Sequence, residues 1–184
     1  MEAIEKSALV RPAVARAAAG KRPLRILFVC TGNICRSPLA QAVFDHFISQ
    51  RGLSGLFESE SAGTHGYHVG DNADPRMRAC AKRHGVKLDH AARKLQAGDI
   101  DYYDLLLAMD SEHLAWLYRL DHDHSASARI RLYREFDSEQ GQGSDVPDPY
   151  YGSSADFEEV WQIVESCTQA LIATLIRAMQ SEAE

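Results

Sequence analysis

The sequence has no uninterrupted apolar run of about 18 residues, the length that a membrane-spanning helix needs. It also has no excess of basic residues, because 20 Lys and Arg stand against 26 Asp and Glu, which gives a formal net charge of −6. Nucleic-acid-binding domains usually carry a basic stripe, so this balance argues against that function. We therefore expect neither a membrane span nor a nucleic-acid partner.

The four cysteines show no C-x2-C pair and no dense framework of the kind that stabilises small secreted proteins; they are Cys30, Cys35, Cys80 and Cys167. The N-terminal segment lacks an apolar stretch long enough for the core of a signal peptide. Free thiols without a secretion signal favour a reducing compartment. We expect the protein to be cytoplasmic.

Two binding motifs are also missing. The nucleotide-binding pattern G-x4-G-K-[ST] does not occur, which excludes a P-loop of that type. His122-Asp123-His124 has no third ligand at a recognisable spacing, so we interpret it as an exposed polar turn. The sequence predicts neither a metal nor a cofactor.

The length of 184 residues and the 45% apolar composition fit one globular domain with a short extension. We assign residues 23–184 to the domain. Residues 1–22 form an extension in which Ala13 to Ala19 favour a short helix, but a poorly ordered, solvated tail is the expectation. No function is assigned to it.

Strand and helix patterns alternate along the domain. Leu24 to Val29 is typical of a fully buried parallel strand, and a helical pattern follows it, with Ser37 as the expected cap and Pro38 in the first turn. Further strands are predicted over 57–61, 105–109 and 130–133, and helices over 74–84, from a Ser111 cap to 120, and from 154 onward. Residues 135–152 are predicted to be a long functional loop. The fold class is therefore α/β, a three-layer domain with a four-stranded, mostly parallel sheet flanked by helices.

A phosphate-binding loop is predicted directly after the first strand, in Cys30-Thr-Gly-Asn-Ile-Cys-Arg36-Ser37. A tight Gly/Asn loop that leads into a helix N-terminus turns backbone N–H groups toward one point, and this suits an anion. The guanidinium of Arg36 can hold two phosphate oxygens. Its positive field also favours the thiolate of Cys30, which makes the sulfur a nucleophile.

C-x5-R-S after an apolar strand resembles the motif of the low-molecular-weight protein tyrosine phosphatase family. Asp148-Pro149-Tyr150-Tyr151-Gly152 is similar to the general-acid loop of that family in residues and in place. The segments 61–67 and 82–86 also resemble family segments, so the similarity runs from about Leu24 to the C-terminal helix. Two motifs more than a hundred residues apart thus agree.

The resemblance implies roles for individual residues. Cys30 would be the nucleophile, Arg36 would stabilise the charge of the transferring phosphoryl group, and Asp148 would be the general acid, with Asp145 as its nearest competitor. The phosphate and the substrate ring would be bound by Thr31, Gly32, Asn33, Ile34, Cys35, Tyr67 and Tyr150, with Tyr151 either a third wall or a packing residue. A supporting hydrogen-bond network would join Asn33, expected to have a left-handed backbone, to Ser37, Ser61 and His90. Cys35 is either a redox partner of Cys30 or a small core residue.

The sequence therefore predicts a phosphatase without metal or cofactor that acts on phosphotyrosine-containing proteins and aryl phosphates and releases inorganic phosphate. A protein-arginine phosphatase, which typically has Thr where Ile34 stands, is a second possibility. A thioredoxin-linked arsenate reductase is a third, and it needs a pair of resolving cysteines in the middle of the chain, where this sequence has only Cys80. A non-enzymatic phosphotyrosine-binding module would be expected to lose the nucleophile or the acid, and both are present.

Overall fold

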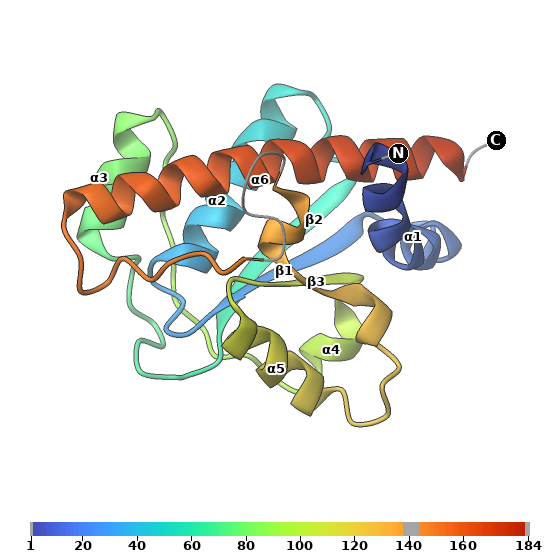
Figure 1. The fold of residues 1–184 in the computed structure, drawn as a ribbon, viewed down its shortest axis with the longest axis horizontal. Helices are drawn as coiled ribbons and strands as arrows, with labels where there is room; N and C mark the ends of the chain where they lie inside the picture. Colours follow the sequence, from blue (N-terminus) through green and yellow to red (C-terminus); the bar gives the residue numbers. More distant parts are fainter. Residues whose placement is uncertain (1, 138–143, 183–184) are drawn as a thin grey trace.

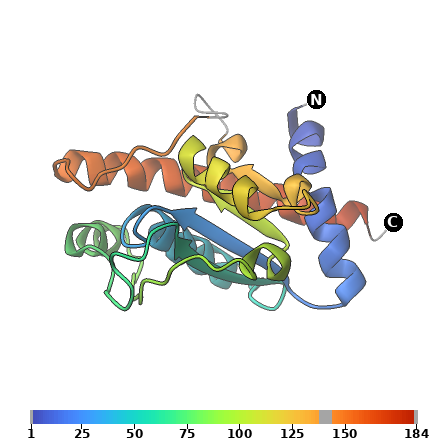
Figure 2. The same ribbon diagram turned by 90° about the horizontal axis from the view of Figure 1, so that it is seen from below.

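The computed structural model describes residues 2–137 and 144–182. Four strands form one sheet in the order β2-β1-β3-β4, and every neighbouring pair is parallel. Helices cover both faces of this sheet (Figures 1 and 2). The predicted α/β class and the four-stranded parallel sheet are confirmed. The strands are β1 Leu24–Cys30, β2 Phe57–Gly63, β3 Leu105–Ala108 and β4 Ile130–Leu132.

The helices predicted from apolar spacing are present close to their expected bounds. The short helices α4, η1 and η2 were not expected, because three or four residues are too few to show a helical period, and η2 includes Tyr133, which was predicted to end a strand. The helices are α1 Glu2–Gly20, α2 Arg36–Gln50, α3 Pro75–Arg83, α4 Asp99–Tyr102, α5 Ser111–Leu120 and α6 Ser154–Ser181, with 3₁₀ turns η1 Ser127–Arg129 and η2 Tyr133–Phe136. Part of the predicted loop 135–152, residues 138–143, lies outside the described residues.

Strand β1 lies in the middle of the molecule and divides the core in two. Ile26 and Phe28 face the core beneath α2 and α6, whereas Leu27 and Val29 face the smaller core beneath α4 and α5. The Phe28 ring lies edge-on to that of Tyr133, with centroids 5.7 Å apart. Because both faces of β1 are covered from Ile26 onward, these positions favour apolar side chains, which explains the apolar run over 26–29.

The N-terminal extension differs from the expectation of a poorly ordered tail. Residues 2–20 form α1, which packs on the C-terminal part of α6, as Figures 1 and 2 show. Val10, Ala13, Val14 and Ala17 repeat at helical spacing and are all buried in the main core. Small side chains give a weak apolar signal, and the helix also contains Pro12. The helix is stabilised by tertiary packing rather than by a strong sequence pattern.

Val14→Asp should lower the melting temperature by roughly 6–20 °C. A buried and unpaired charge typically costs about 3–5 kcal/mol, and this range is that free energy converted to a melting-temperature shift for a chain of this size. Thermal unfolding followed by circular dichroism measures this. Ala15→Asp is the matched control, since Ala15 is the exposed neighbour on the same helix. Equal effects of the two substitutions would contradict the docking of α1.

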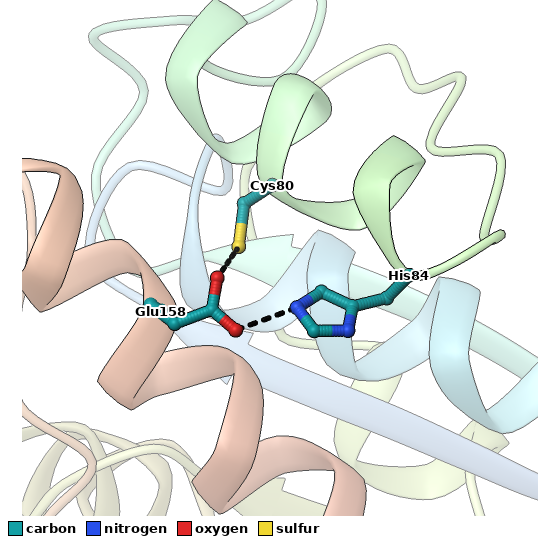
Figure 3. A group of neighbouring side chains, drawn as sticks. All are labelled: Cys80, His84 and Glu158. Atoms are coloured by element: carbon teal, nitrogen blue, oxygen red, sulfur yellow. Dashed lines mark hydrogen bonds and ion pairs between the residues drawn. The ribbon is translucent and has the colours of Figure 1, made fainter.

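Helix α3 packs against the beginning of α6. Helix α6 starts where Ser153 caps it: the Ser153 hydroxyl accepts from Ala155 N, and Asp156 Oδ2 accepts from Ser153 N at 2.6 Å. Just beyond this cap, Glu158 of α6 lies against Cys80 and His84 of the α3 segment (Figure 3). The segment that contains Asp148 therefore ends on a rigid, well-capped helix.

Candidate active site

Cys30 is the last residue of β1 and lies beside Gly63, the last residue of β2. Its side chain is buried, and Sγ lies 3.0 Å from Ser37 Oγ. In parallel α/β sheets, ligands bind beyond the carboxyl ends of the strands. The sulfur is thus placed where such a fold binds its ligand.

Gly63 holds the loop and the sheet edge close together. A Cβ at this position would lie 2.7 Å from the carbonyl oxygen of Thr31 and 3.1 Å from the backbone nitrogen of Asn33. Backbone atoms cannot move away cheaply, so only glycine fits at this close approach. The end of β2 thereby fixes the position of the loop after Cys30.

Asn33 has a left-handed backbone, with φ of 56°, as expected. Its Nδ2 donates to Ser37 Oγ (2.9 Å) and to Ser61 Oγ (3.0 Å). Its Oδ1 accepts from Arg93 N at 2.9 Å and lies 3.0 Å from His90 Nε2. The structure therefore brings together Asn33, Ser37, Ser61 and His90, and it adds Arg93, which the sequence did not suggest. These bonds hold the loop in a backbone conformation that non-glycine residues rarely adopt.

Ser37 does not cap α2, contrary to the expectation. The helix begins at Arg36 with Cys35 in the cap position, and no side chain accepts a bond there. Ser37 Oγ instead contacts Asn33 and Cys30. The first turn of a helix has unpartnered N–H groups, so α2 presents donors to an anion rather than to its own side chain.

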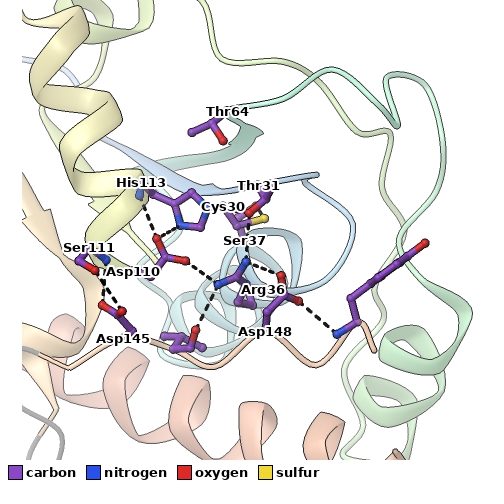
Figure 4. A network of polar contacts seen from close by, with 12 residues as sticks. Cys30, Thr31, Arg36, Ser37, Thr64, Asp110, Ser111, His113, Asp145 and Asp148 are labelled. Carbon is purple, nitrogen blue, oxygen red and sulfur yellow. Dashed lines mark hydrogen bonds and ion pairs between the residues drawn. The ribbon is translucent and has the colours of Figure 1, made fainter. Parts of the chain in front are cut away.

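The guanidinium of Arg36 is buried and contacts groups from distant parts of the chain (Figure 4). One terminal nitrogen donates to Asp110 Oδ2 at 2.8 Å and to the carbonyl oxygen of Val146 at 3.2 Å. The other donates to Asp148 Oδ2 at 2.7 Å and to Thr31 Oγ1 at 3.2 Å. Asp110 thus anchors the guanidinium from the side of α5, while Asp148 contacts it in the pocket.

Asp110 and His113 are site residues that sequence reasoning missed. Asp110, not Ser111 as expected, caps α5: its Oδ1 accepts from His113 N at 2.9 Å, and His113 Nδ1 lies 2.7 Å from the same oxygen. Burial raises the pKa of Asp110, but the bonds from His113 and the charge of Arg36 outweigh it and lower that pKa to about 2. Asp110 is therefore a permanent anion behind Arg36. An Asp before a helix start was visible in the sequence, but its pairing with Arg36 was not.

The two candidate acids are separated by the fold. The Asp148 side chain is 49% exposed, lines the pocket and also accepts from Tyr150 N through Oδ1 at 3.1 Å. The carboxylate of Asp145 instead accepts from the backbone nitrogen (2.8 Å) and the hydroxyl (3.1 Å) of Ser111, at the N-terminus of α5. Figure 4 shows the two on opposite sides of Arg36. Only Asp148 is a pocket residue.

The loop, Arg36 and Asp148 open into a cavity of about 310 Å³. Its rim carries aromatic side chains that are exposed by 76%, 37% and 97%, respectively: Tyr67, Tyr150 and Tyr151. The Tyr67 ring stacks on His65 with centroids 5.2 Å apart, which holds it upright at the rim. The cavity is lined by Cys30, Thr31, Gly32, Ile34, Cys35, Arg36, Tyr67, His68, Asp148, Tyr150 and Tyr151. Among these, His68 was not anticipated.

The remaining cysteines differ in their surroundings. Cys35 borders the cavity and is buried, and burial raises the pKa of its thiol well above the usual value. Cys80 lies between α3 and α6 and Cys167 lies in the core side of α6, so neither reaches the cavity. All four cysteines are free thiols.

The fold is an α/β domain, and a thiol, a buried arginine and a helix N-terminus meet at one end of its parallel sheet. This combination defines a class of domains that bind phosphate and are equipped for covalent catalysis. The family described as low molecular weight phosphotyrosine protein phosphatase matches residues 25–181. The chain belongs to this family, which confirms the resemblance seen in the motifs.

Individual proteins agree with this assignment. A low molecular weight protein-tyrosine-phosphatase of Streptomyces coelicolor is 45% identical over 160 residues, which cover 86% of this chain and 98% of the relative. The crystal structure of a protein tyrosine phosphatase from Entamoeba histolytica is similar with a TM-score of 0.76 at 35% identity, covering 84% of this chain and 97% of that chain. The structure of a Drosophila arginine phosphatase is similar with a TM-score of 0.74 at 27% identity, covering 81% and 96%. The fold alone therefore does not choose between the two phosphorylated side chains.

Proposed function

We propose that the protein hydrolyses phosphotyrosine in proteins, and small aryl phosphates, through a phosphocysteine intermediate on Cys30. The observation that carries this proposal is that one cavity is lined by Cys30 and Arg36 and by Asp148, which lies more than a hundred residues further along the chain. We place the reaction in a reducing compartment, the cytoplasm, because the nucleophile must remain a thiol.

The first half-reaction needs an oriented sulfur and a stabilised phosphoryl group. Cys30 Sγ attacks phosphorus, the bond from phosphorus to the phenolic oxygen breaks, and the phosphoryl group becomes attached to sulfur. Arg36 and the N–H groups at the start of α2 stabilise the charge on the equatorial oxygens. The contact with Asp110 keeps Arg36 in place for this role.

Asp148 then acts on the leaving group. The phosphate of the substrate competes with Asp148 for the N–H groups of Arg36, which frees the carboxyl group of Asp148 to act on the leaving group. The acid donates its proton to the departing phenolate. In the second half-reaction the resulting carboxylate takes a proton from water, which attacks the phosphocysteine and releases inorganic phosphate.

The aromatic rim supports an aryl substrate. Tyr67 and Tyr150 both line the cavity and are exposed, and their ring faces suit stacking with a flat ring. In phosphotyrosine the phenyl ring carries the phosphate away from the surface of the substrate protein, so that the phosphate can reach the loop of the enzyme. Phosphotyrosine presents such a ring to the aromatic side chains of the rim.

The most direct test compares phosphotyrosine and phosphoarginine peptides under reducing conditions with a chelator present. The proposal expects faster turnover of phosphotyrosine that does not depend on added metal. Preferential turnover of phosphoarginine would support an arginine phosphatase on the same scaffold. No turnover of either peptide or of aryl phosphates would reject the proposed chemistry.

Ile34 is the residue that we expect to set this preference, since it lines the cavity beside the nucleophile. A branched apolar side chain favours a ring, whereas Thr offers a hydroxyl group and less bulk to a guanidinium. Ile34→Thr should raise the phosphoarginine to phosphotyrosine ratio of kcat/KM by roughly tenfold or more, the scale of about 1–3 kcal/mol that one such contact is worth. Ile34→Val, which stays branched and apolar, should leave the ratio nearly unchanged. An unaltered ratio in Ile34→Thr would mean that Ile34 does not determine the choice.

Neither an arsenate reductase nor a non-enzymatic phosphotyrosine-binding module gains support from the site. An arsenate reductase needs resolving thiols that reach the nucleophile, and Cys80 is engaged with Phe157 O and Glu158 on α6. A module that only binds phosphotyrosine has no need of an acid that contacts the phosphate-binding arginine. Asp148 makes that contact.

A further inference from the structure

Cys80, His84 and Glu158 converge outside the cavity of the active site. Cys80 and His84 are one helical turn apart at the end of α3, and Glu158 reaches them from the second turn of α6, as Figure 3 shows. Cys80 Sγ lies 3.6 Å from Glu158 Oε2, and His84 Nε2 lies 2.6 Å from Glu158 Oε1. Among the residues that the structure describes, they are the one group of three metal-ligating types whose ligand atoms all lie within 4.8 Å of one another.

The separations are close to those of a tetrahedral zinc site. Zinc bonds of about 2.3 Å to sulfur and about 2.0–2.1 Å to nitrogen and oxygen place such ligand atoms roughly 3.3–3.6 Å apart. The distance from Cys80 Sγ to Glu158 Oε2 already has this value, whereas His84 Nε2 and Glu158 Oε1 need to separate by less than about 1 Å. The ligand atoms of all three residues lie within 4.8 Å of one another, so we expect side-chain rotation to bring them to these distances.

We propose that Cys80, His84 and Glu158 bind a zinc ion, with water as the fourth ligand. In the metal-free protein both Cys80 and His84 are within hydrogen-bonding distance of one carboxylate, and the metal takes the place of these bonds. Binding forms the Zn–S, Zn–N and Zn–O bonds and releases the proton of the Cys80 thiol to solvent. The doubly charged cation is then neutralised by one thiolate and one carboxylate.

The surroundings orient the ligands and leave a path for the metal. The His84 ring is stacked on Trp161, with centroids 4.3 Å apart and an angle of 5° between the planes, so the imidazole is held in one plane. The side chains of His84 and Glu158 are about one-third exposed, which gives solvent access, while Cys80 is buried. Arg83 also pairs with Glu158 Oε2, at 3.0 Å, but its side chain is 54% exposed and can turn into solvent.

The expected effect of the metal is structural. It would tie the end of α3 to the second turn of α6, which follows the segment that contains Asp148. None of the three ligands lines the active-site cavity. The site would therefore bind zinc whether or not the proposed phosphatase reaction is correct.

The test uses the full chain with Cys30→Ser and Cys35→Ser, so that the thiols of the active site do not bind metal. Zinc at a hundredfold excess over Kd should raise the melting temperature by about 5–10 °C. Cobalt, used as a spectroscopic substitute, should show the absorption of a tetrahedral complex and a thiolate charge-transfer band. A competition titration with a chromogenic chelator gives Kd and a stoichiometry of one.

Single substitutions in this background decide between the site and general metal binding. His84→Gln and Glu158→Gln, at partly exposed positions, and Cys80→Ala should each weaken zinc binding by a factor of about 100 or more, since even changes around the ligands cost about 10–100-fold. The cobalt thiolate band should vanish in Cys80→Ala. The matched controls are Glu159→Gln and Cys167→Ala, and both should bind zinc normally. Glu159 is an exposed neighbour of Glu158 on α6, and Cys167 is a buried thiol on the same helix.

Because each variant is compared with and without zinc, an altered baseline stability does not affect the result. If Cys80→Ala fails to fold, the His84 and Glu158 variants still decide. Absence of the cobalt thiolate band in the background protein, or a zinc-induced shift that persists in His84→Gln and Glu158→Gln, overturns the proposal.

Discussion

Cys30→Ser should reduce turnover of an aryl phosphate by about six orders of magnitude, the scale seen when a hydrolase loses its covalent nucleophile. The serine hydroxyl is a far weaker nucleophile than a thiolate in the same position, and no other thiol of the chain stands at the end of β1. Binding of inorganic phosphate should persist, because Arg36 and the start of α2 remain. Steady-state kinetics and a phosphate-binding titration measure the two effects separately.

Cys167→Ala is the matched control for a lost thiol. Cys167 is buried in α6 and does not line the cavity, so its loss should leave kcat close to that of the unmodified protein. Substantial residual turnover in Cys30→Ser would remove Cys30 from the mechanism. Loss of both phosphate binding and turnover would indicate that the loop had collapsed. Cys30 would then be needed to maintain the conformation of the loop as well as for the chemistry.

Asp148→Ala should slow hydrolysis of phosphotyrosine by about 10²–10⁴-fold, the usual contribution of a general acid. A substrate whose phenol is strongly acidic should be affected much less, because its phenolate leaves without a proton. The measurement is kcat across a series of aryl phosphates with phenols of different pKa. In the variant, kcat should depend more steeply on that pKa than in the unmodified protein.

Asp145→Ala is the control for a carboxylate in the same segment. Asp145 binds Ser111 at the start of α5, so its removal should affect α5 and leave the dependence on the leaving group unchanged. An equal loss across the whole phenol series in Asp148→Ala would reject Asp148 as the acid. A steeper dependence in Asp145→Ala would transfer the role to Asp145.

Asp148 and Asp110 together explain how one arginine serves two requirements. Asp110 contacts Arg36 from the more buried side and is itself held by His113, so we expect that bond to persist when phosphate binds. The Asp148 carboxylate is about half exposed and contacts the other nitrogen, so its bond can be exchanged for one to phosphate. The guanidinium of Arg36 is therefore held by Asp110 through one nitrogen, and its other nitrogen is free to exchange Asp148 for a phosphate oxygen.

The regular elements with a strong pattern could be predicted from the sequence. Strand β1 is covered on both faces, so its apolar run is continuous, and the long apolar stripe of α6 has a clear helical period. For α1 the sequence indicated only a short helix over 13–19 and not its full length or its docking, because these depend on a surface of α6 more than a hundred positions away. The pattern of a segment does not show whether a distant partner exists.

The sequence by itself determined the family, because two motifs more than a hundred residues apart agree. It also predicted a phosphate-binding loop, because Cys30 to Arg36 are contiguous and their spacing encodes a local backbone that converges on one point. Only the tertiary structure decided which carboxylate meets Arg36. The contacts to Asp110 and Asp148 join residues 74 and 112 positions apart in the chain. The same holds for Cys80, which no sequence motif joined to His84 and Glu158 and which the structure places beside them. Such contacts depend on how helices and strands pack in space, and that packing brings together side chains whose separation along the chain carries no signal.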